Sequence, residues 1–262
     1  MKHLVLVGAC YIDTILTSND HENNNDDGGS DDVIDFSSCL FRDDHDQAAA
    51  SWILRSDETN SRTIVNWNDL PEMTTDEFRG IVEGLKQQTN PAEDSANSEW
   101  WFHFEGRIPA TTLQCMHYLR NAIPGCKISV EVEKPNREGL RDLASEADVV
   151  FYSKVWAESE GYSDPEACLR SEARSSKAVL TVCTWGADGA GSLISGGRYI
   201  HCPANRSGEQ IKVVDTLGAG DTFIAGMLYA LHTSATYDQA LTFAVGLATK
   251  KVQQEGFAGL VS

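Results

Sequence analysis

A short segment near the C-terminus places two aspartates around a glycine-rich turn. Residues 215–221 read DTLGAGD, and the apolar run FIAGMLYAL follows from residue 223. Small residues let backbone N–H groups converge, and the first turn of a helix leaves such groups unpaired at the positive end of its dipole. Gly218, Ala219 and Gly220 therefore suit an anion hole for a transferring phosphoryl group. Asp221, beside that hole, could accept the proton of an attacking hydroxyl.

The same segment also has a purely structural interpretation. Aspartate at the start of a helix is a common N-cap, and glycine before a helix is common turn chemistry. The residue types alone leave both interpretations of Asp221 open. The compact order D-T-x-G-A-G-D, however, resembles the signature of the PfkB, or ribokinase-like, carbohydrate kinases. That resemblance implies that Asp221 is the catalytic base and that Gly218, Ala219 and Gly220 form the anion hole.

Within that family the chain resembles the ketohexokinase branch. The matching stretches are SRTIV, FHFEGR, SVEVEKP, DVVFYSK, VVDTLGAGDTF and ATKKVQQEGFAG. They come in the same order and cover residues 4–15 and roughly 46–260. The resemblance implies ATP-dependent, Mg²⁺-assisted phosphorylation of a sugar primary hydroxyl, with fructose to fructose 1-phosphate favoured. It further implies a three-layer α/β/α fold with a mainly parallel sheet and a small β lid, through which two copies could pair.

Three other places in the sequence match positions that bind ligands in the family. Asp13 matches the aspartate that binds sugar hydroxyls, although it could also be a polar strand terminus. Arg62 matches an arginine near the nucleotide phosphates, a role that suits its fork of donors. The loop of WGADGA matches one that borders ATP, and without the resemblance it would be a simple turn. Its residues are Gly186, Ala187, Asp188 and Gly189.

The metal ligands are not identified by the sequence. Glu131 and Glu133 alternate along SVEVEKP, and we expect them to point to opposite faces of one strand, with at most one facing the site. The N-x-x-E element that helps to place magnesium in ribokinases is absent from SKVW at 153–156. His103, His201 and the cysteines are expected to be packed or solvated rather than catalytic.

Composition indicates a soluble globular protein with a small-molecule partner. A net charge of -18 leaves no basic stripe for nucleic acid or anionic membrane, and 41% hydrophobic residues allow a substantial core. Seven cysteines without CxxC spacing fit reduced thiols in a cytoplasmic protein. Because Asp13 interrupts the apolar N-terminal stretch, a buried first strand at 4–13 is favoured over a secretory signal.

The remaining patterns predict alternating strands and helices. Expected strands are 48–55 and 61–67, paired as a hairpin, then 100–106, 127–133, 147–153 and 178–186, and a last hairpin within 191–204. Expected helices are 74–88, 109–122, 220–232 and 237–253. This βαβα order predicts a mainly parallel sheet with helices on both faces.

The family's GGN segment after the first strand is absent here. Residues 18–35 are instead acidic and amide-rich, and cannot offset their own ordering entropy by burial. We interpret residues 1–262 as one kinase domain in which an acidic loop at 18–45 replaces part of the lid and of the first helix. A deletion, splice form or gene-model error explains such a gap better than gradual divergence, because the flanking matches are intact. The alternative function is a catalytically impaired nucleotide-binding or regulatory protein of the same fold.

Two other enzyme classes are excluded by their missing motifs. VGACYID at the first turn has one glycine and no GxGxxG, against a nicotinamide-dependent oxidoreductase. The GxxxxGK[ST] sequence of a P-loop enzyme is also missing.

Overall fold

The computed structural model describes residues 2–9, 12–16, 35–55, 62–88, 99–205, 208 and 211–260, with the backbone alone for 12–16, 55 and 62. The chain divides into two compact units: residues 1–7 with 86–262 form the larger, and residues 8–85 the smaller. Most of the acidic stretch expected at 18–35 lies outside the described residues. Residues 35–49 contain turns and bends without a helix or strand.

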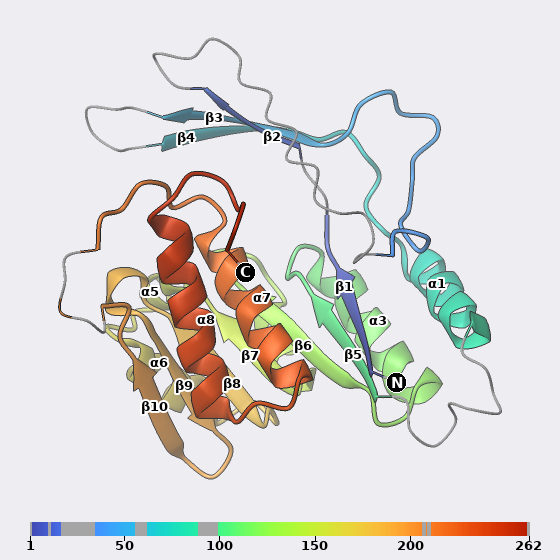
Figure 1. The fold of residues 1–262 in the computed structure, drawn as a ribbon. Helices are drawn as coiled ribbons and strands as arrows, with labels where there is room; N and C mark the ends of the chain where they lie inside the picture. The colour runs from blue at the N-terminus through green and yellow to red at the C-terminus, as the bar shows by residue number, and fades with distance from the viewer. Residues whose placement is uncertain are drawn as a thin grey trace. The chain divides into compact units, whose positions relative to one another are not determined.

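The larger unit is built on a seven-stranded sheet (Figure 1). In spatial order its strands are β1 (Lys2–Val7), β5 (Glu99–Phe104), β6 (Lys127–Val132), β7 (Val149–Tyr152), β8 (Leu180–Thr184), β9 (Ala190–Ile194) and β10 (Arg198–Cys202). The first five strands run parallel to one another, and β9 pairs antiparallel with both β8 and β10. The predicted mainly parallel sheet is therefore confirmed. So is the last hairpin, which turns at Gly196 and Gly197 with φ of 99° and 92°.

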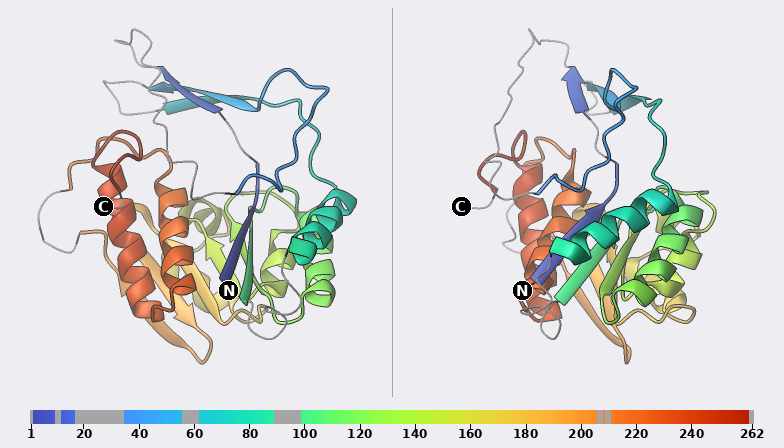
Figure 2. Two further views of the ribbon diagram at one scale, coloured as in Figure 1. Left: turned by 45° about the vertical axis from the view of Figure 1, so that its right-hand side comes forward. Right: turned by 90° about the vertical axis from the view of Figure 1, so that its right-hand side faces the viewer.

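Helices cover both faces of this sheet, as predicted (Figures 1 and 2). On one face lie α7 (Ala219–His232) and α8 (Tyr237–Val252), and on the other α3 (Pro109–Ala122), α4 (Leu140–Glu146), α5 (Lys154–Ser159) and α6 (Pro165–Glu172). A core cluster joins α7 and α8 to the sheet through Phe151, Val182, Phe223, Met227 and Leu241. None of the described helices is both long and apolar enough to cross a membrane.

Local capping explains where several helices begin. Pro109 occupies the first turn of α3, where its missing N–H costs no hydrogen bond. Thr236 caps α8 in a reciprocal capping box with Gln239. Asp164 caps α6 by accepting a hydrogen bond from the Ala167 amide at 2.8 Å. Three helix starts are thus determined by residues adjacent in sequence.

The predicted first strand at 4–13 is wrong. β1 ends at Val7, and β2 (Ile12–Leu16) belongs to a different sheet. The expectation that this strand is buried also fails, because β1 is the terminal strand of its sheet and Leu4 and Leu6 are 36% and 65% exposed. The core cluster under α7 and α8 reaches β5 but contains no β1 residue among its buried members.

The smaller unit contains a three-stranded sheet and a helix. β2 pairs in parallel with β3 (Ala50–Arg55), which pairs antiparallel with β4 (Arg62–Trp67), so the predicted hairpin is confirmed. The predicted helix is α1 (Thr75–Gln88), whose last residues fall in the larger unit. Thr74 and Glu77 form a capping box at its start, with the Thr74 amide 2.8 Å from Glu77 Oε2.

Candidate functional site

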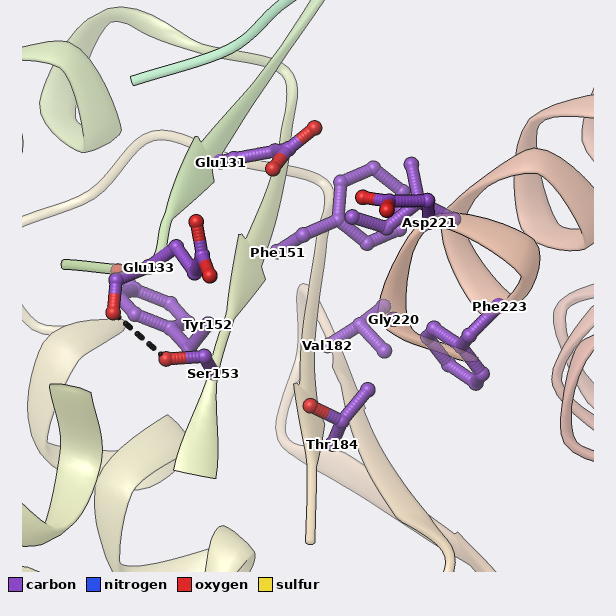
Figure 3. Close-up of a pocket in the computed structure, with 11 residues that line it drawn as sticks. Glu131, Glu133, Phe151, Tyr152, Ser153, Val182, Thr184, Gly220, Asp221 and Phe223 are labelled. Carbon is purple, nitrogen blue, oxygen red and sulfur yellow. Dashed lines mark hydrogen bonds between the residues drawn. The ribbon is translucent and has the colours of Figure 1, made fainter. Parts of the chain in front are cut away.

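A pocket in the larger unit lies where strand ends meet the N-terminus of α7 (Figure 3). Its lining comes from the ends of β6, β7 and β8 and from the first turns of α7. The residues are Glu131, Glu133, Phe151, Tyr152, Ser153, Val182, Thr184, Gly220, Asp221, Phe223 and Ile224. In open α/β sheets, ligands bind outside the carboxyl ends of the strands. The pocket occupies that position.

The start of α7 presents its first turn to this pocket. Gly218 is the N-cap, in the left-handed conformation with φ of 67°, and makes no side-chain cap. Ala219 and Gly220 follow, and Asp221 is the third helical residue. The interpretation of Asp221 as the N-cap is therefore wrong, since Gly218 holds that position. Asp221 is solvent-exposed and lines the pocket beside Gly220.

Gly218 is favoured by its left-handed conformation and lies close to the ring of Phe257. A Cβ atom at this position would lie 2.5 Å from Cζ of Phe257, closer than real side chains approach. The carbonyl oxygen of Gly218 accepts hydrogen bonds from both the amide and Oγ1 of Thr222, each at 2.8 Å. Together these contacts determine how the chain enters α7, and so where the first-turn N–H groups point.

Both glutamates of SVEVEKP line the pocket, so the prediction that at most one would do so is wrong. Residues two apart in a strand share a face, and Glu133 follows directly after β6. Figure 3 shows the two glutamates on the strand side of the pocket and Asp221 on the helix side. Ser153 Oγ donates to the Glu133 carbonyl at 2.8 Å and ties the end of β6 to the start of α5.

A buried hydrogen-bond network of His103, Ser129 and Trp101 contacts the Glu131 carboxylate. His103 Nε2 lies 2.9 Å from Glu131 Oε1, and its Nδ1 lies 2.8 Å from Ser129 Oγ. Trp101 Nε1 donates to the same hydroxyl at 2.9 Å. His103 is packed, as expected, but its contact with a pocket residue was missed. The sequence did carry a signal for this contact, since polar residues alternate with apolar ones on both neighbouring strands. His103 and Ser129 are register partners on those strands.

Other predicted site residues lie outside the pocket lining. The loop at 186–189 follows β8, with Gly186–Asp188 a short exposed helical turn and Gly189 buried at φ of 89°. A Cβ at Gly189 would lie 2.1 Å from the carbonyl oxygen of Cys202, so only glycine fits there. Asp13 is the second residue of β2 and Arg62 the first of β4, both in the smaller unit. The side chains of Asp13 and Arg62 are outside the described residues.

The described cysteines and His201 show no catalytic arrangement. Six cysteines fall in the described residues, and all six are free thiols. Burial raises the pKa of Cys126 to about 11, and a hydrogen bond with Cys183 together with burial raises the pKa of Cys168, so both stay protonated and unreactive at neutral pH. His201 Nε2 contacts the Asp188 carbonyl at 3.0 Å. Within the described residues, no group of three or more His, Cys, Asp or Glu could hold a metal.

Comparison with known proteins finds similarity to carbohydrate kinases. A family model described as pfkB family carbohydrate kinase matches residues 31–261. The chain is 31% identical to ketohexokinase of Mus musculus over 236 residues, which are 87% of this chain and 73% of that protein.

Solved structures show the same fold. Adenosine kinase from Sinorhizobium meliloti is 19% identical with a TM-score of 0.61, covering 82% of this chain and 64% of its own. Arabidopsis thaliana ribokinase, complexed with ribose and ATP, is 18% identical with a TM-score of 0.57, covering 80% and 64%. The chain thus spans less than two thirds of either structure.

Proposed function

The chain belongs to the pfkB family of carbohydrate kinases, and from this membership we propose that it transfers the γ-phosphoryl group of ATP to a sugar primary hydroxyl. A ketohexose such as fructose is the favoured acceptor, because the mouse relative is a ketohexokinase. The observation that carries this proposal is that Gly220 and Asp221, in the first turn of α7, line one pocket with Glu131 and Glu133.

Each part of that pocket has a proposed role. The sugar hydroxyl attacks the γ-phosphorus while the bond from that phosphorus to the bridging oxygen breaks, and Asp221 accepts the hydroxyl proton. The first-turn N–H groups of α7, after Gly218, Ala219 and Gly220, hold the phosphoryl oxygens at the positive end of the helix dipole. Gly220 brings no side chain into the approach of the anion.

The residues present fit ATP and Mg²⁺. An anion suits the start of α7, and Mg²⁺ usually binds through one or two carboxylates together with substrate phosphates. Glu131 and Glu133 offer carboxylates on the strand side of the pocket. When bound, the ion would neutralise charge on the phosphates. From the family resemblance we also assign nucleotide contacts to Arg62 and the loop at 186–189, and sugar contacts to Asp13.

The wider setting of the enzyme is also part of the proposal. We place it in the cytoplasm as a single kinase domain, with the acidic segment at 18–45 in place of part of the lid and first helix. Two copies would pair through the three-stranded sheet, where Trp52, Leu54 and Val65 are exposed. The exposed face of β1 favours the alternative function, a nucleotide-binding or regulatory protein, since a complete α/β/α sheet would cover Leu4 and Leu6.

Sugar-dependent ADP formation tests the proposal. With fructose, ribose and adenosine offered separately, we expect fructose to give the highest rate. Asp221→Asn should lower kcat by a factor of about 10² or more, because it removes the proton acceptor and keeps the shape. Asp238→Asn is the matched control, since Asp238 also lies in the first turn of a helix and is exposed.

Three outcomes of this experiment are informative. Near-normal turnover by Asp221→Asn would contradict the role of the base. A wild-type protein that binds a non-hydrolysable ATP analogue in calorimetry but phosphorylates none of the three acceptors would support the alternative function. A folded protein that binds no analogue at millimolar concentration would contradict both.

A further inference from the structure

A buried lysine lies behind the glycine-rich loop. Lys251, near the end of α8, is 0% exposed and lies outside the pocket lining. Its Nζ donates to Asp215 Oδ2 at 2.6 Å and lies 3.5 Å from the Asp215 carbonyl oxygen. The ammonium group also sits 5.1 Å from the ring centroid of Phe257, within range of a cation–π interaction. Because a buried charge is costly, an unpaired ammonium would not be tolerated here.

Through Asp215 and Phe257, Lys251 is connected to both ends of the glycine-rich loop at 215–220. Asp215 uses its second oxygen, Oδ1, to accept a hydrogen bond from the Leu217 amide at 2.9 Å. Phe257 packs against Gly218, where a Cβ atom would lie 2.5 Å from its ring. One ammonium group therefore contacts the residue that begins the loop and the ring that presses on the N-cap of α7.

The backbone alone does not account for this arrangement. The amides of Val214 and Asp215 donate to the Val252 carbonyl at 2.7 and 3.2 Å, which fixes the segment before α7 against the end of α8. Neither bond determines the rotation of the Asp215 side chain. That rotation decides whether Oδ1 reaches the Leu217 amide, and the ion pair with Lys251 constrains it.

We propose that Lys251 is a positioning residue for the phosphate-binding loop. It holds Asp215 and Phe257 where they give residues 215–220 their conformation, and so aims the first-turn N–H groups of α7 at the pocket. The role of the loop in binding phosphate rests on the proposed function. The control of loop conformation by Lys251 does not, and it can be measured without any ligand.

The first experiment compares two neighbouring lysines by hydrogen exchange. Lys251→Met keeps most of the side-chain volume and removes the charge. Lys250→Met is the matched control, because Lys250 is exposed on the same helix and donates to the carbonyls of Gly259 and Leu260 at 2.6 and 3.0 Å. We expect the Leu217 amide to exchange about tenfold or more faster in Lys251→Met, and within about twofold of wild type in the control.

The second experiment separates positioning from simple stabilisation. Calorimetry with a non-hydrolysable ATP analogue and Mg²⁺ should give a Kd about tenfold higher for Lys251→Met and unchanged for Lys250→Met. The double variant Lys251→Met/Asp215→Asn leaves no unpaired buried charge, so its unfolding midpoint should return toward that of wild type. Its Kd should stay high, because the orienting ion pair is still missing. Recovery of both quantities would overturn the positioning role.

The remaining outcomes also decide the matter. Unchanged Leu217 exchange and unchanged Kd in folded Lys251→Met would refute the inference. Failure of the wild-type protein to bind the analogue would count against the proposed function alone, since exchange still tests the loop. If Lys251→Met does not fold, the double variant Lys251→Met/Asp215→Asn takes its place, because it leaves no unpaired buried charge. Faster Leu217 exchange in that variant would support the inference, and wild-type exchange would refute it.

Discussion

The two sheets of this protein differ in how their strands are covered. β7 reads VVFY, and all four of its side chains are buried. In the smaller sheet, Trp52, Leu54 and Val65 are 40%, 48% and 50% exposed, while Ile53 is buried. Burial is thus unbroken along β7, whereas it alternates along β3, which has an open face although Trp52–Leu54 is itself an apolar run. The pocket is built at strand ends of the larger sheet, where helices on both faces hold the strands in place.

The largest effect we expect is a loss of stability in the larger unit. Phe102 is fully buried in β5, and Phe102→Ala should lower the free energy of unfolding by about 3–5 kcal/mol through lost burial and cavity formation. Leu54→Ala, in the open face of β3, should cost less than about 1 kcal/mol. Urea denaturation measures both. An equal loss of unfolding free energy in Leu54→Ala would contradict this difference between the two sheets, because it would mean that this face is covered in solution.

A smaller effect should appear in nucleotide affinity. Arg62→Gln removes a guanidinium that we assign to the nucleotide phosphates, and charge-assisted hydrogen bonds of this kind contribute about 1.5–3 kcal/mol. We expect the Kd of an ATP analogue to rise at least tenfold, with an unchanged unfolding midpoint. Arg55→Gln is the control, since Arg55 is the register partner of Arg62 on β3. Equal weakening by both variants would point to general electrostatics rather than a specific contact.

The smallest effect is a pH dependence in the smaller unit. A hydrogen bond from Arg42 lowers the pKa of Glu77 from its ordinary value of 4.5 to about 2. The unfolded chain therefore binds more protons in this range, so the stabilisation is complete above pH 4.5 and is lost as the pH falls toward about 2. Because both side chains keep contact with solvent, we expect this ion pair to contribute at most about 1 kcal/mol to the free energy of unfolding.

Glu77→Gln should remove that pH dependence, as followed by urea denaturation between pH 5 and about 2.5. Asp76→Asn is the control, because Asp76 lies in the same helical turn and pairs with Arg79 at 3.2 Å. An unchanged pH profile in Glu77→Gln would show that the Arg42 contact contributes nothing to stability.

Local signals predicted most of the fold. The helix at 109–122 was predicted with the bounds that α3 has, because Pro109 marks its start and the apolar spacing its length. The prediction of the first strand was wrong because the relevant information is not local. Apolar residues run on through 4–13, and nothing in that pattern shows that the chain changes sheets after Val7. Sheet membership depends on partners far away in sequence, which a local pattern does not contain.

The candidate site divides in the same way. Gly220 and Asp221 were found because their chemistry is contiguous in DTLGAGD. Glu133 was misplaced by an error in strand geometry, since residues two apart share a face. Lys251 was not found, although its position carries a signal. It lies three residues after Ala248 on the stripe of α8 that buries Leu241 and Ala244, where a lysine needs a buried partner.

The terminal position of β1 also affects how the purified protein should be handled. A sheet edge with exposed Leu4 and Leu6 is a template on which another chain can add a strand. The net charge of -18 keeps copies apart, but added salt screens that repulsion. Ionic strength should therefore govern shelf life: dilute buffers favour dispersed material, and concentrated salt favours precipitation that begins at this edge.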